Sequence, residues 1–576
     1  MPGGVLRVAV CLALAAAAAP SAGCARGAGR ARQPRAASPA PAPPPPITAA
    51  AYSHYLRGRL AALEEDDARA AAELRAAVAA APGEAPIHVA LADVLLGAGR
   101  RDQALSAIEA AQRRFPRDAG VWRESGRIYR KVDRQGDAAR AYQRAVALDP
   151  DDEKSYLGLA ASWLALRSAA RVEATYRALI ARHPTSVAGH HALGARLLAR
   201  GRLNDAEVEL RRALDLDPSH VQARVALARV LRARGRTGEA LSLLREAFDR
   251  SSSVEIGERL FAQLLESGDR AGAVALLGQL DRDDLELDVR VSFGYLYLQV
   301  GEAKEARALA ARLAAQSPPG SAVRLLDARA LVALGRRADA IPALLEVAPG
   351  RPGYAQCRAL AAELLARSGR HAEARAAIDE ALAHHPRDDE LVIGQALVSE
   401  LAGRTAEARA ALEAAVDARR HDDELLYALA GFEARQGVPD RAVALAQRIL
   451  DRNPDHGAAL NFIGFSLADR KRELPRAERL LERALALSPT DGNVLDSIGW
   501  LRFRQGRLAE SQELLERAAR LAPAEPEILW HLGELYLAQS DPRRALELYE
   551  KARALGPEEP VRRRIEARIH ALRAER

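Results

Sequence analysis

The fold of this chain is decided by the stretch from Ala119 to Pro150, which reads AGVWRESGRIYRKVDRQGDAARAYQRAVALDP. Its apolar residues recur at offsets of three and four, which predicts two amphipathic helices. Gly126 and Ala138 are small residues that allow the two helices to approach closely. We expect Gly136 to form the turn between them, because glycine marks breaks in helical patterns. Pro150 ends the second helix, since proline cannot continue it.

The same pattern recurs along most of the chain, mostly at a period of 34 residues. A period of 20 to 50 residues is typical of stacked copies of one supersecondary unit. The prolines that close successive copies are Pro82, Pro116, Pro150, Pro184, Pro218, Pro318, Pro352, Pro386, Pro454, Pro489, Pro523 and Pro557. The chain is therefore predicted to be a solenoid, which offers a long surface for binding rather than one converging pocket.

Several residues of the Ala119–Pro150 copy resemble the tetratricopeptide repeat (TPR), a pair of antiparallel helices. They are Trp122, Gly126, Tyr129, Ala138, Tyr142, Ala145 and Pro150. The resemblance implies an all-α, right-handed superhelical TPR solenoid of about fifteen helix-turn-helix repeats. Val561, Ile565 and Ile569 share one helical face after the last repeat, which predicts a C-terminal capping helix.

Composition and repeat quality divide the chain into six expected segments. They are a signal peptide with a lipobox (1–23), a Pro/Ala-rich tether (24–48), an N-terminal array (49–252), an irregular repeat segment (253–353), a C-terminal array (354–557) and the capping helix (558–576). Pro342 falls inside a predicted helix, and such a proline kinks or breaks it. Sequence drift with normal packing is the alternative explanation of the irregular segment.

Acidic pairs follow several of the repeat ends, at the points where the next helix begins. Asp151-Asp152, Asp388-Asp389 and Asp422-Asp423 are placed to cap free N–H groups and to suit the helix dipole.

The N-terminal sequence predicts where in the cell the protein is located. Arg7 precedes an apolar run from Val8 to Ala19, too short to span a bilayer and typical of a signal peptide. The run Ser21 to Cys24 resembles a bacterial lipobox, which implies a lipid on Cys24. Ser21 departs from the leucine that the pattern prefers, so ordinary cleavage near Ala25 is the alternative. In enteric bacteria an aspartate after the lipidated cysteine retains a lipoprotein in the inner membrane. By that resemblance, Ala25 implies export to the outer membrane of the cell envelope, facing the periplasm.

The residues that follow Cys24 are expected to form a semi-rigid spacer, because proline-rich segments stay extended. Cys11 lies in the signal peptide, so Cys357 has no partner for a disulfide within the chain. It is expected to be a small buried hydrophobe, the alternative being a reactive thiol.

The charge distribution argues against a nucleic-acid partner. The formal net charge is +7, but five basic residues and no acid precede residue 51, which leaves +2 for the rest. A nucleic-acid binder shows a clustered basic face instead.

No sequence motif indicates catalysis. We find no phosphate-binding GxxxxGK[ST] loop, no HExxH metal motif and no GxSxG elbow. His190-His191 and His384-His385 are adjacent pairs whose side chains point in different directions on a helix. The chain is predicted to be no enzyme, to use no metal or cofactor, and to have no small-molecule substrate.

In the TPR family the first helix of each repeat lines the concave groove, which suggests two candidate surfaces. One holds four cations able to clamp a carboxylate, unless nearby acids neutralise them. These are Arg123, Arg127, Arg130 and Lys131. The other combines aromatic rings with amide and carboxylate groups near the C-terminus, which suits an extended peptide unless the rings only pack adjacent repeats. It contains Tyr427, Asn461, Phe465, Asn493, Asp496, Trp500, Phe503 and Trp530.

The runs Leu460–Arg470 and Val494–Trp500 look like the C-terminal repeats of large proteobacterial TPR lipoproteins. Some of these are envelope adaptors that hold carboxy-terminal processing proteases. The resemblance implies a membrane-tethered, non-catalytic scaffold that binds proteins or peptides. The alternative is a TPR component of an exopolysaccharide or outer-membrane assembly machine.

Overall fold

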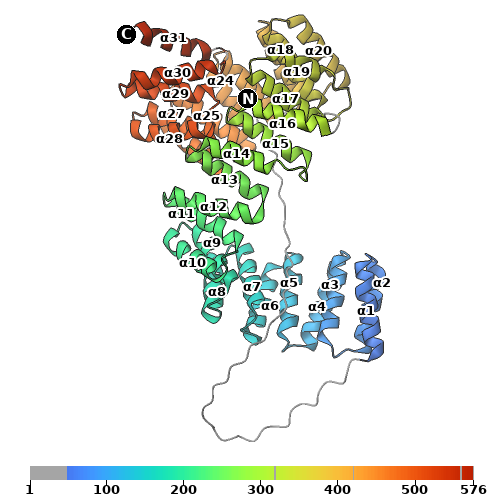
Figure 1. Ribbon diagram of the computed structural model, residues 1–576. Helices are drawn as coiled ribbons and strands as arrows, with labels where there is room; N and C mark the ends of the chain where they lie inside the picture. Colours follow the sequence, from blue (N-terminus) through green and yellow to red (C-terminus); the bar gives the residue numbers. More distant parts are fainter. Residues whose placement is uncertain (1–47, 317–319, 420, 558, 560, 575–576) are drawn as a thin grey trace. The chain divides into compact units, whose positions relative to one another are not determined.

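The computed structural model describes residues 48–316, 320–419, 421–557, 559 and 561–574. Within these ranges the chain forms 31 α-helices and no strand (Figure 1). The helices make fifteen successive pairs, and α31 follows the last pair. The prediction of an all-α TPR solenoid of about fifteen repeats is confirmed.

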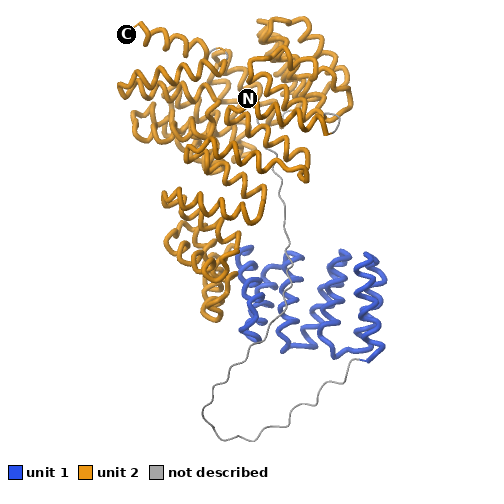
Figure 2. The backbone as a smooth tube through the Cα atoms, in the orientation of Figure 1, with its two compact units in different colours: residues 1–166 blue, residues 167–576 orange. Residues whose placement is uncertain are grey.

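The helices fall into two compact units, residues 1–166 and 167–576 (Figure 2). The first unit contains α1 (Ala49–Leu63), α2 (Asp67–Ala80), α3 (Ala85–Gly97), α4 (Arg101–Arg114), α5 (Ala119–Lys131), α6 (Gln135–Leu148) and α7 (Glu153–Ala165). The second begins with α8 (Ala169–Arg182), α9 (Val187–Ala199), α10 (Leu203–Leu216), α11 (Val221–Ala233), α12 (Thr237–Ser251), α13 (Val254–Glu266), α14 (Arg270–Leu280), α15 (Leu287–Gln299), α16 (Ala303–Gln316), α17 (Ser321–Ala333), α18 (Arg337–Leu345) and α19 (Tyr354–Arg367). It continues with α20 (His371–His384), α21 (Asp389–Leu401), α22 (Thr405–Ala418), α23 (Asp423–Arg435), α24 (Pro439–Arg452), α25 (Gly457–Asp469), α26 (Leu474–Leu487), α27 (Gly492–Arg504), α28 (Leu508–Leu521), α29 (Pro526–Ala538), α30 (Pro542–Ala554) and α31 (Val561–Ala574).

A glycine at the eighth residue of the first helix sets how closely the two helices of a repeat pack. In α5 a Cβ atom at Gly126 would lie 2.7 Å from the ring of Tyr142 on α6. In α9 a Cβ atom at Gly194 would lie 2.6 Å from Leu210 Cγ on α10. Real Cβ atoms do not approach so closely, so the missing side chain is what admits the large residue of the second helix.

The turn between paired helices differs from the expectation at Gly136. This glycine lies inside α6, and the left-handed position belongs to Asp133, with φ 64°. Aspartate tolerates this conformation better than most residues because its short side chain bonds the local backbone. At the corresponding turn after α9 a glycine does supply it, since Gly201 has φ 71°.

Helix caps and prolines join each repeat to the next. The Asp388 and Asp422 side chains accept hydrogen bonds from Leu391 N and Leu425 N, as expected, whereas Asp152 makes no such cap. Trp122 Nε1 donates to the carbonyl of Pro116, 3.1 Å away, so the tryptophan fastens α5 to the preceding closing proline.

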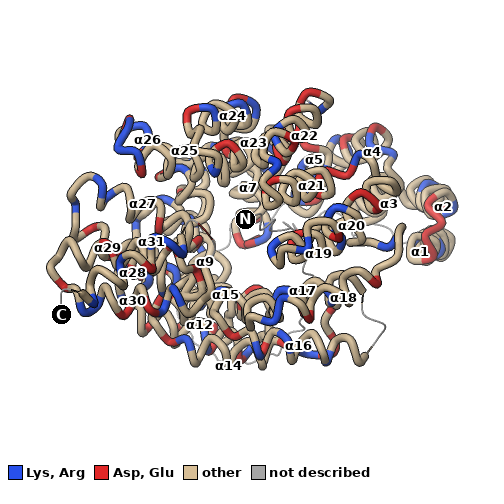
Figure 3. Tube along the Cα trace, turned by 90° about the horizontal axis from the view of Figure 1, so that it is seen from above, with Lys and Arg blue, Asp and Glu red and all other residues tan. Residues whose placement is uncertain are grey.

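Buried ion pairs also connect repeats. Glu207 on α10 is 3% exposed and pairs with Arg211 on its own helix and with Arg234 and Arg236 after α11. The same arrangement recurs one repeat earlier around Glu173. Many arginines therefore bind acids of adjacent repeats, and Figure 3 shows the two signs of charge interspersed along the helices.

In the irregular segment, α18 has 9 residues and contains Pro342. The same part of unit 2 contacts a distant part of the chain. Arg517 on α28 pairs with Glu266 at the end of α13, and Gln299 Nε2 donates to the Leu521 carbonyl at 2.9 Å. Leu521 belongs to the buried apolar cluster that extends from α9 to α17. The superhelix of unit 2 therefore contacts itself about seven repeats later (Figure 1).

The C-terminal end of the solenoid is covered. Ile565, Ile569 and Leu572 of α31 are buried against the apolar cluster of the last repeat, which confirms the predicted capping helix. The predicted signal peptide, the predicted lipid site at Cys24 and almost all of the predicted tether lie outside the described residues. Among the described helices, none has the length and apolar character needed to span a bilayer.

We predict that Gly194→Ala destabilises the protein by about 1–3 kcal/mol, because the added methyl group overpacks against Leu210. Gly238→Ala is the matched control: it lies in α12 with no atom within 4 Å of an added Cβ, and it should be neutral or slightly stabilising. Urea unfolding followed by circular dichroism measures both. Equal effects at the two glycines would show that close helix contact is not the cause.

Candidate functional site

Four residues of the second predicted surface occupy one register row. Tyr427, Asn461, Asp496 and Trp530 are each the fifth residue of the first helix of a repeat, in α23, α25, α27 and α29. These four helices are the first helices of consecutive repeats, so the row crosses the C-terminal part of unit 2. Tyr427, Asn461 and Trp530 are half-buried, whereas Asp496 is buried.

An aromatic cluster lies at this row, on α25, α27 and α29. We define the cluster as Phe465, Trp500, Phe503, Trp530 and His531. Trp500 is at its centre and is 2% exposed. Its ring stacks with His531 at 4.3 Å and with Phe503 at 4.9 Å between centroids, and lies 5.6 Å from Trp530. The structure thus brings together four of the predicted aromatic residues and adds a histidine that the sequence analysis did not single out.

A buried ion pair lies within the cluster. His531 Nδ1 is 2.8 Å from Asp496 Oδ2, and His531 is 1% exposed. Burial lowers the pKa of the imidazole, but the Asp496 carboxylate, with smaller contributions from Glu527 and Asp469, raises that pKa above its usual value. The His531–Asp496 pair therefore joins α29 to α27.

Cations lie against two rings of the cluster. The Arg504 guanidinium lies 5.4 Å from the Trp500 ring centroid, and the Arg564 guanidinium lies 5.3 Å from that of Trp530. At these distances a guanidinium is attracted to an aromatic face. Trp500 Nε1 also donates to Asp469 Oδ1 at 3.1 Å, so the central ring is held on several sides.

Three polar atoms near the row lack a hydrogen-bond partner among the described residues, although they are buried. They are Asn461 Oδ1, Trp530 Nε1 and His531 Nε2. A buried polar atom without a partner costs about 1–3 kcal/mol. These atoms have almost no accessible surface, so a ligand reaches them only after the side chains rotate. An extended peptide carries both donors and acceptors along its backbone.

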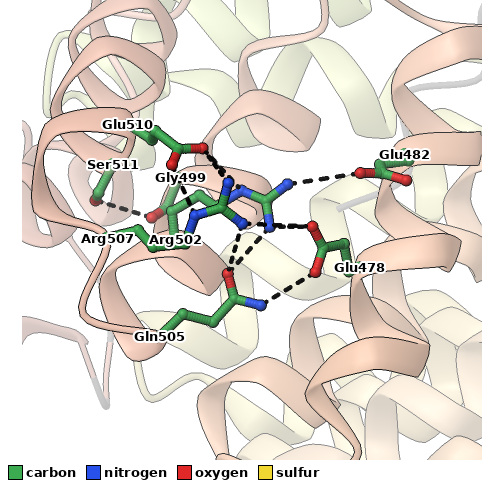
Figure 4. A network of polar contacts seen from close by, with 8 residues as sticks. All are labelled: Glu478, Glu482, Gly499, Arg502, Gln505, Arg507, Glu510 and Ser511. Carbon is green, nitrogen blue, oxygen red and sulfur yellow. Dashed lines mark hydrogen bonds and ion pairs between the residues drawn. The ribbon is translucent and has the colours of Figure 1, made fainter.

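A polar network around Arg502 and Arg507 joins α26, α27 and α28 (Figure 4). Arg502 on α27 is 8% exposed and pairs with Glu478 and Glu482 of α26 and with Glu510 of α28. Arg507 also pairs with Glu478 and Glu510. The network fixes α27 between its neighbours, which keeps the rings of the cluster in place.

The remaining predicted residue of this surface, Asn493, has an exposed side chain. Its backbone N–H donates to Asp491 Oδ1 at 2.8 Å, which caps α27. Cys357 is buried, and burial raises the pKa of its thiol to about 11. Over the described ranges no three His, Cys, Asp or Glu side chains form a group able to hold a metal ion.

The first predicted surface lies in unit 1 on α5, and acids neutralise part of it. Arg123 pairs with Asp152 at 3.3 Å, and Arg127 pairs with Asp93 at 2.7 Å. Arg130 and Lys131 are exposed. The two paired arginines hold adjacent repeats together, so fewer cations remain for a carboxylate ligand.

Comparison with protein families agrees with this geometry. A family model described as tetratricopeptide repeat matches residues 89–153, 359–424 and 497–560, and a second with the same description matches residues 197–250 and 401–463. The chain is built from tetratricopeptide repeats. Proteins with these repeats bind other proteins or peptides, and the fold is typically a non-catalytic scaffold.

The chain is also similar to individual proteins. It is 44% identical over 62 residues to the TPR repeat-containing protein PA4667 of Pseudomonas aeruginosa, which covers 11% of this chain and a tenth of that protein. The crystal structure of yeast Tom70 aligns over 79% of this chain and 96% of its own, at 16% identity and a TM-score of 0.33. Pseudomonas aeruginosa pilF aligns over 36% and 94%, at 15% identity and a TM-score of 0.31.

We predict that the Asp496–His531 pair makes stability depend on pH. Because the folded-state pKa of His531 is raised, its stabilisation is complete below about pH 6.5, the usual histidine value, and is lost as the pH rises through the folded-state pKa. Asp496→Asn should therefore cost about 1–3 kcal/mol at pH 6 and less at pH 9. Urea unfolding at the two pH values measures the difference.

The control is Asp215→Asn, which changes an exposed carboxylate on α10 and should be close to neutral at both pH values. If Asp496→Asn had the same cost at pH 6 and pH 9, the pair would not be charged in the folded protein.

Proposed function

We propose that this protein is a non-catalytic scaffold of the bacterial cell envelope, tethered through a lipid on Cys24 to the outer membrane and facing the periplasm. The first helices of its C-terminal repeats, α23, α25, α27 and α29, hold an extended segment of a partner protein. The observation that carries the binding role is the register row of half-buried side chains at Tyr427, Asn461 and Trp530, with Phe465 beside it.

The chemistry of these side chains suits a polypeptide. The Asn461 amide and the Trp530 indole belong to half-buried side chains, and once rotated toward the groove they can accept from a peptide N–H and donate to a peptide carbonyl. Phe465 and Tyr427 are half-buried and offer apolar area beside these groups.

Two partner classes follow from the proposal. The resemblance of residues 460–500 to envelope adaptors favours a carboxy-terminal processing protease. The alternative, a part of an exopolysaccharide or outer-membrane assembly machine, would have the rings stack on sugar. Trp500 is 2% exposed and already stacked, so the most central ring is closed to either ligand, and contact falls to the half-buried Phe465 and Trp530.

We predict that a photo-crosslinking amino acid at Phe465 or Asn493 of the full chain captures a small set of envelope proteins in cells. Trp530→Ala should lower the captured yield at least about tenfold, the loss expected for a central aromatic contact. Mass spectrometry identifies and quantifies the products. Tyr295→Ala, which removes a ring that is 38% exposed on α15, is the matched control and should leave the yield unchanged.

Equal capture by the wild type and by Trp530→Ala would refute the groove proposal. So would capture of polysaccharide alone.

We predict that the mature N-terminus is Cys24 carrying acyl chains, and that Cys24→Ala lacks them. Acyl chains contribute about 0.8 kcal/mol per buried CH₂ to membrane binding, so detergent-phase partition should be lost in the variant. Mass spectrometry of the N-terminal peptide checks the modification directly. An unmodified N-terminus at or beyond Ala25 would establish ordinary cleavage and rule out the lipid tether.

A further inference from the structure

The first turn of α11 is capped by a histidine. His220 has an extended backbone, with ψ 94°, and its Nδ1 accepts a hydrogen bond from Ala223 N at 3.1 Å. In α5 and α9 the same role belongs to Asp118 and Ser186, whose side chains also accept from the third N–H of the helix. Such a cap satisfies one of the four free N–H groups at the start of a helix.

An imidazole can fill this role only in its neutral form. The Ala223 N–H is the donor, so Nδ1 of His220 must supply a lone pair and Nε2 must carry the proton. A protonated imidazole carries a hydrogen on both nitrogens and has no acceptor left, and it also places positive charge at the positive end of the helix dipole. Because histidine changes its charge between pH 5 and 8, the cap is made in mild base and lost in mild acid.

The same ring belongs to the junction between two consecutive repeats. His220 lies against His191, the fifth residue of α9, with the ring centroids 4.9 Å apart. Burial, together with the nearby His220, lowers the pKa of His191 to about 4, so this neighbour stays neutral at pH 5. A protonated His220 therefore has a neutral, half-buried ring as its partner on α9.

The charged groups around His220 compensate for a proton only in part. Asp217 lies in the turn before it and attracts a charged imidazole, but Ser219 N and Oγ already donate to Asp217 Oδ1 at 2.9 and 2.6 Å. Arg224, one turn further along α11, pairs with Glu246 of α12 at 3.0 Å. Since both acids are already engaged, the start of α11 loses its acceptor in acid.

A second histidine cap shows why α11 is the sensitive position. His456 caps α25 in the same way, with Nδ1 accepting from the third N–H of the helix at 3.2 Å. Asp422 and Asp491 cap the first helices of the repeats on either side of it, whereas the helices on either side of α11 follow the uncharged Ser186 and Ser253. A charge at His456 thus has carboxylates in the adjacent repeats, and a charge at His220 does not.

We propose that His220 is an acid-sensitive cap whose protonation loosens the junction between α9 and α11. At pH 8 the ring caps α11 and packs against His191. At pH 5 the cap is lost and the first turn of α11 frays. The sign is opposite to that predicted for the Asp496–His531 pair, which acid stabilises. The inference does not depend on the proposed groove or on the lipid.

Hydrogen exchange of the full-length protein, resolved to single amides, tests the proposal. Observed rates are divided into the intrinsic rates at pH 8 and pH 5, so that only protection is compared. Protection of the Ala223 amide should fall at least about threefold from pH 8 to pH 5, the loss expected for one helix cap. The Gly189 amide, which donates to Ser186 Oγ at 2.8 Å, is the matched control and should change less than about twofold, because a hydroxyl does not titrate in this range.

His220→Asn separates the lost cap from a general effect of acid. Asparagine caps helices well and carries no titrating group, so the variant should fold and keep Ala223 equally protected at both pH values. Unchanged protection of Ala223 in the wild type would overturn the proposal. So would an equal fall in His220→Asn, or an equal fall at Gly189, since either would show that acid loosens the repeats without acting through His220.

Discussion

The close approach of two helices at a glycine is the constraint on which this structure depends. At Gly464, Gly499 and Gly533 the second helix of the repeat places Leu481, Leu515 or Tyr549 where the glycine side chain would otherwise be. Each such contact fixes the geometry of one helix pair. The remaining faces of that pair then pack against the pairs before and after it. Stacking, and with it the register of every groove position, follows from this local geometry.

Most of the fold could be predicted because it is local and repeated. The 34-residue period, the small residues at the helix crossing and the Asp388 and Asp422 caps each act within one or two repeats. The turn at Asp133 was missed because a nearby glycine offered a better pattern than an aspartate in the left-handed region. The contact of α13 with α28 could not be predicted, since it results from small rotations accumulated over about seven repeats.

The candidate site was only partly visible in the sequence for a related reason. The aromatic residues near the C-terminus attract notice because such residues make up only 4% of the chain. His531 does not, because its importance comes from Asp496, which lies 35 residues earlier and becomes its neighbour only through stacking of α27 on α29. The repeat period itself is the signal that could have found the pair, since residues one period apart lie side by side on adjacent repeats.

A regular solenoid makes its exceptions informative. Where each repeat obeys the same packing rule, a residue that departs from the rule has to be explained by something outside that rule. Arg502 departs from the rule because it forms a buried ionic network with Glu478 and Glu510. The network holds α27 in place and with it the rings of Trp500 and Phe503. The two ends depart in opposite ways: α31 buries its apolar residues under a charged outer face, whereas α1 exposes Leu56 and Leu60. One terminal helix therefore covers the apolar cluster of its neighbouring repeat, whereas the other leaves large apolar side chains exposed.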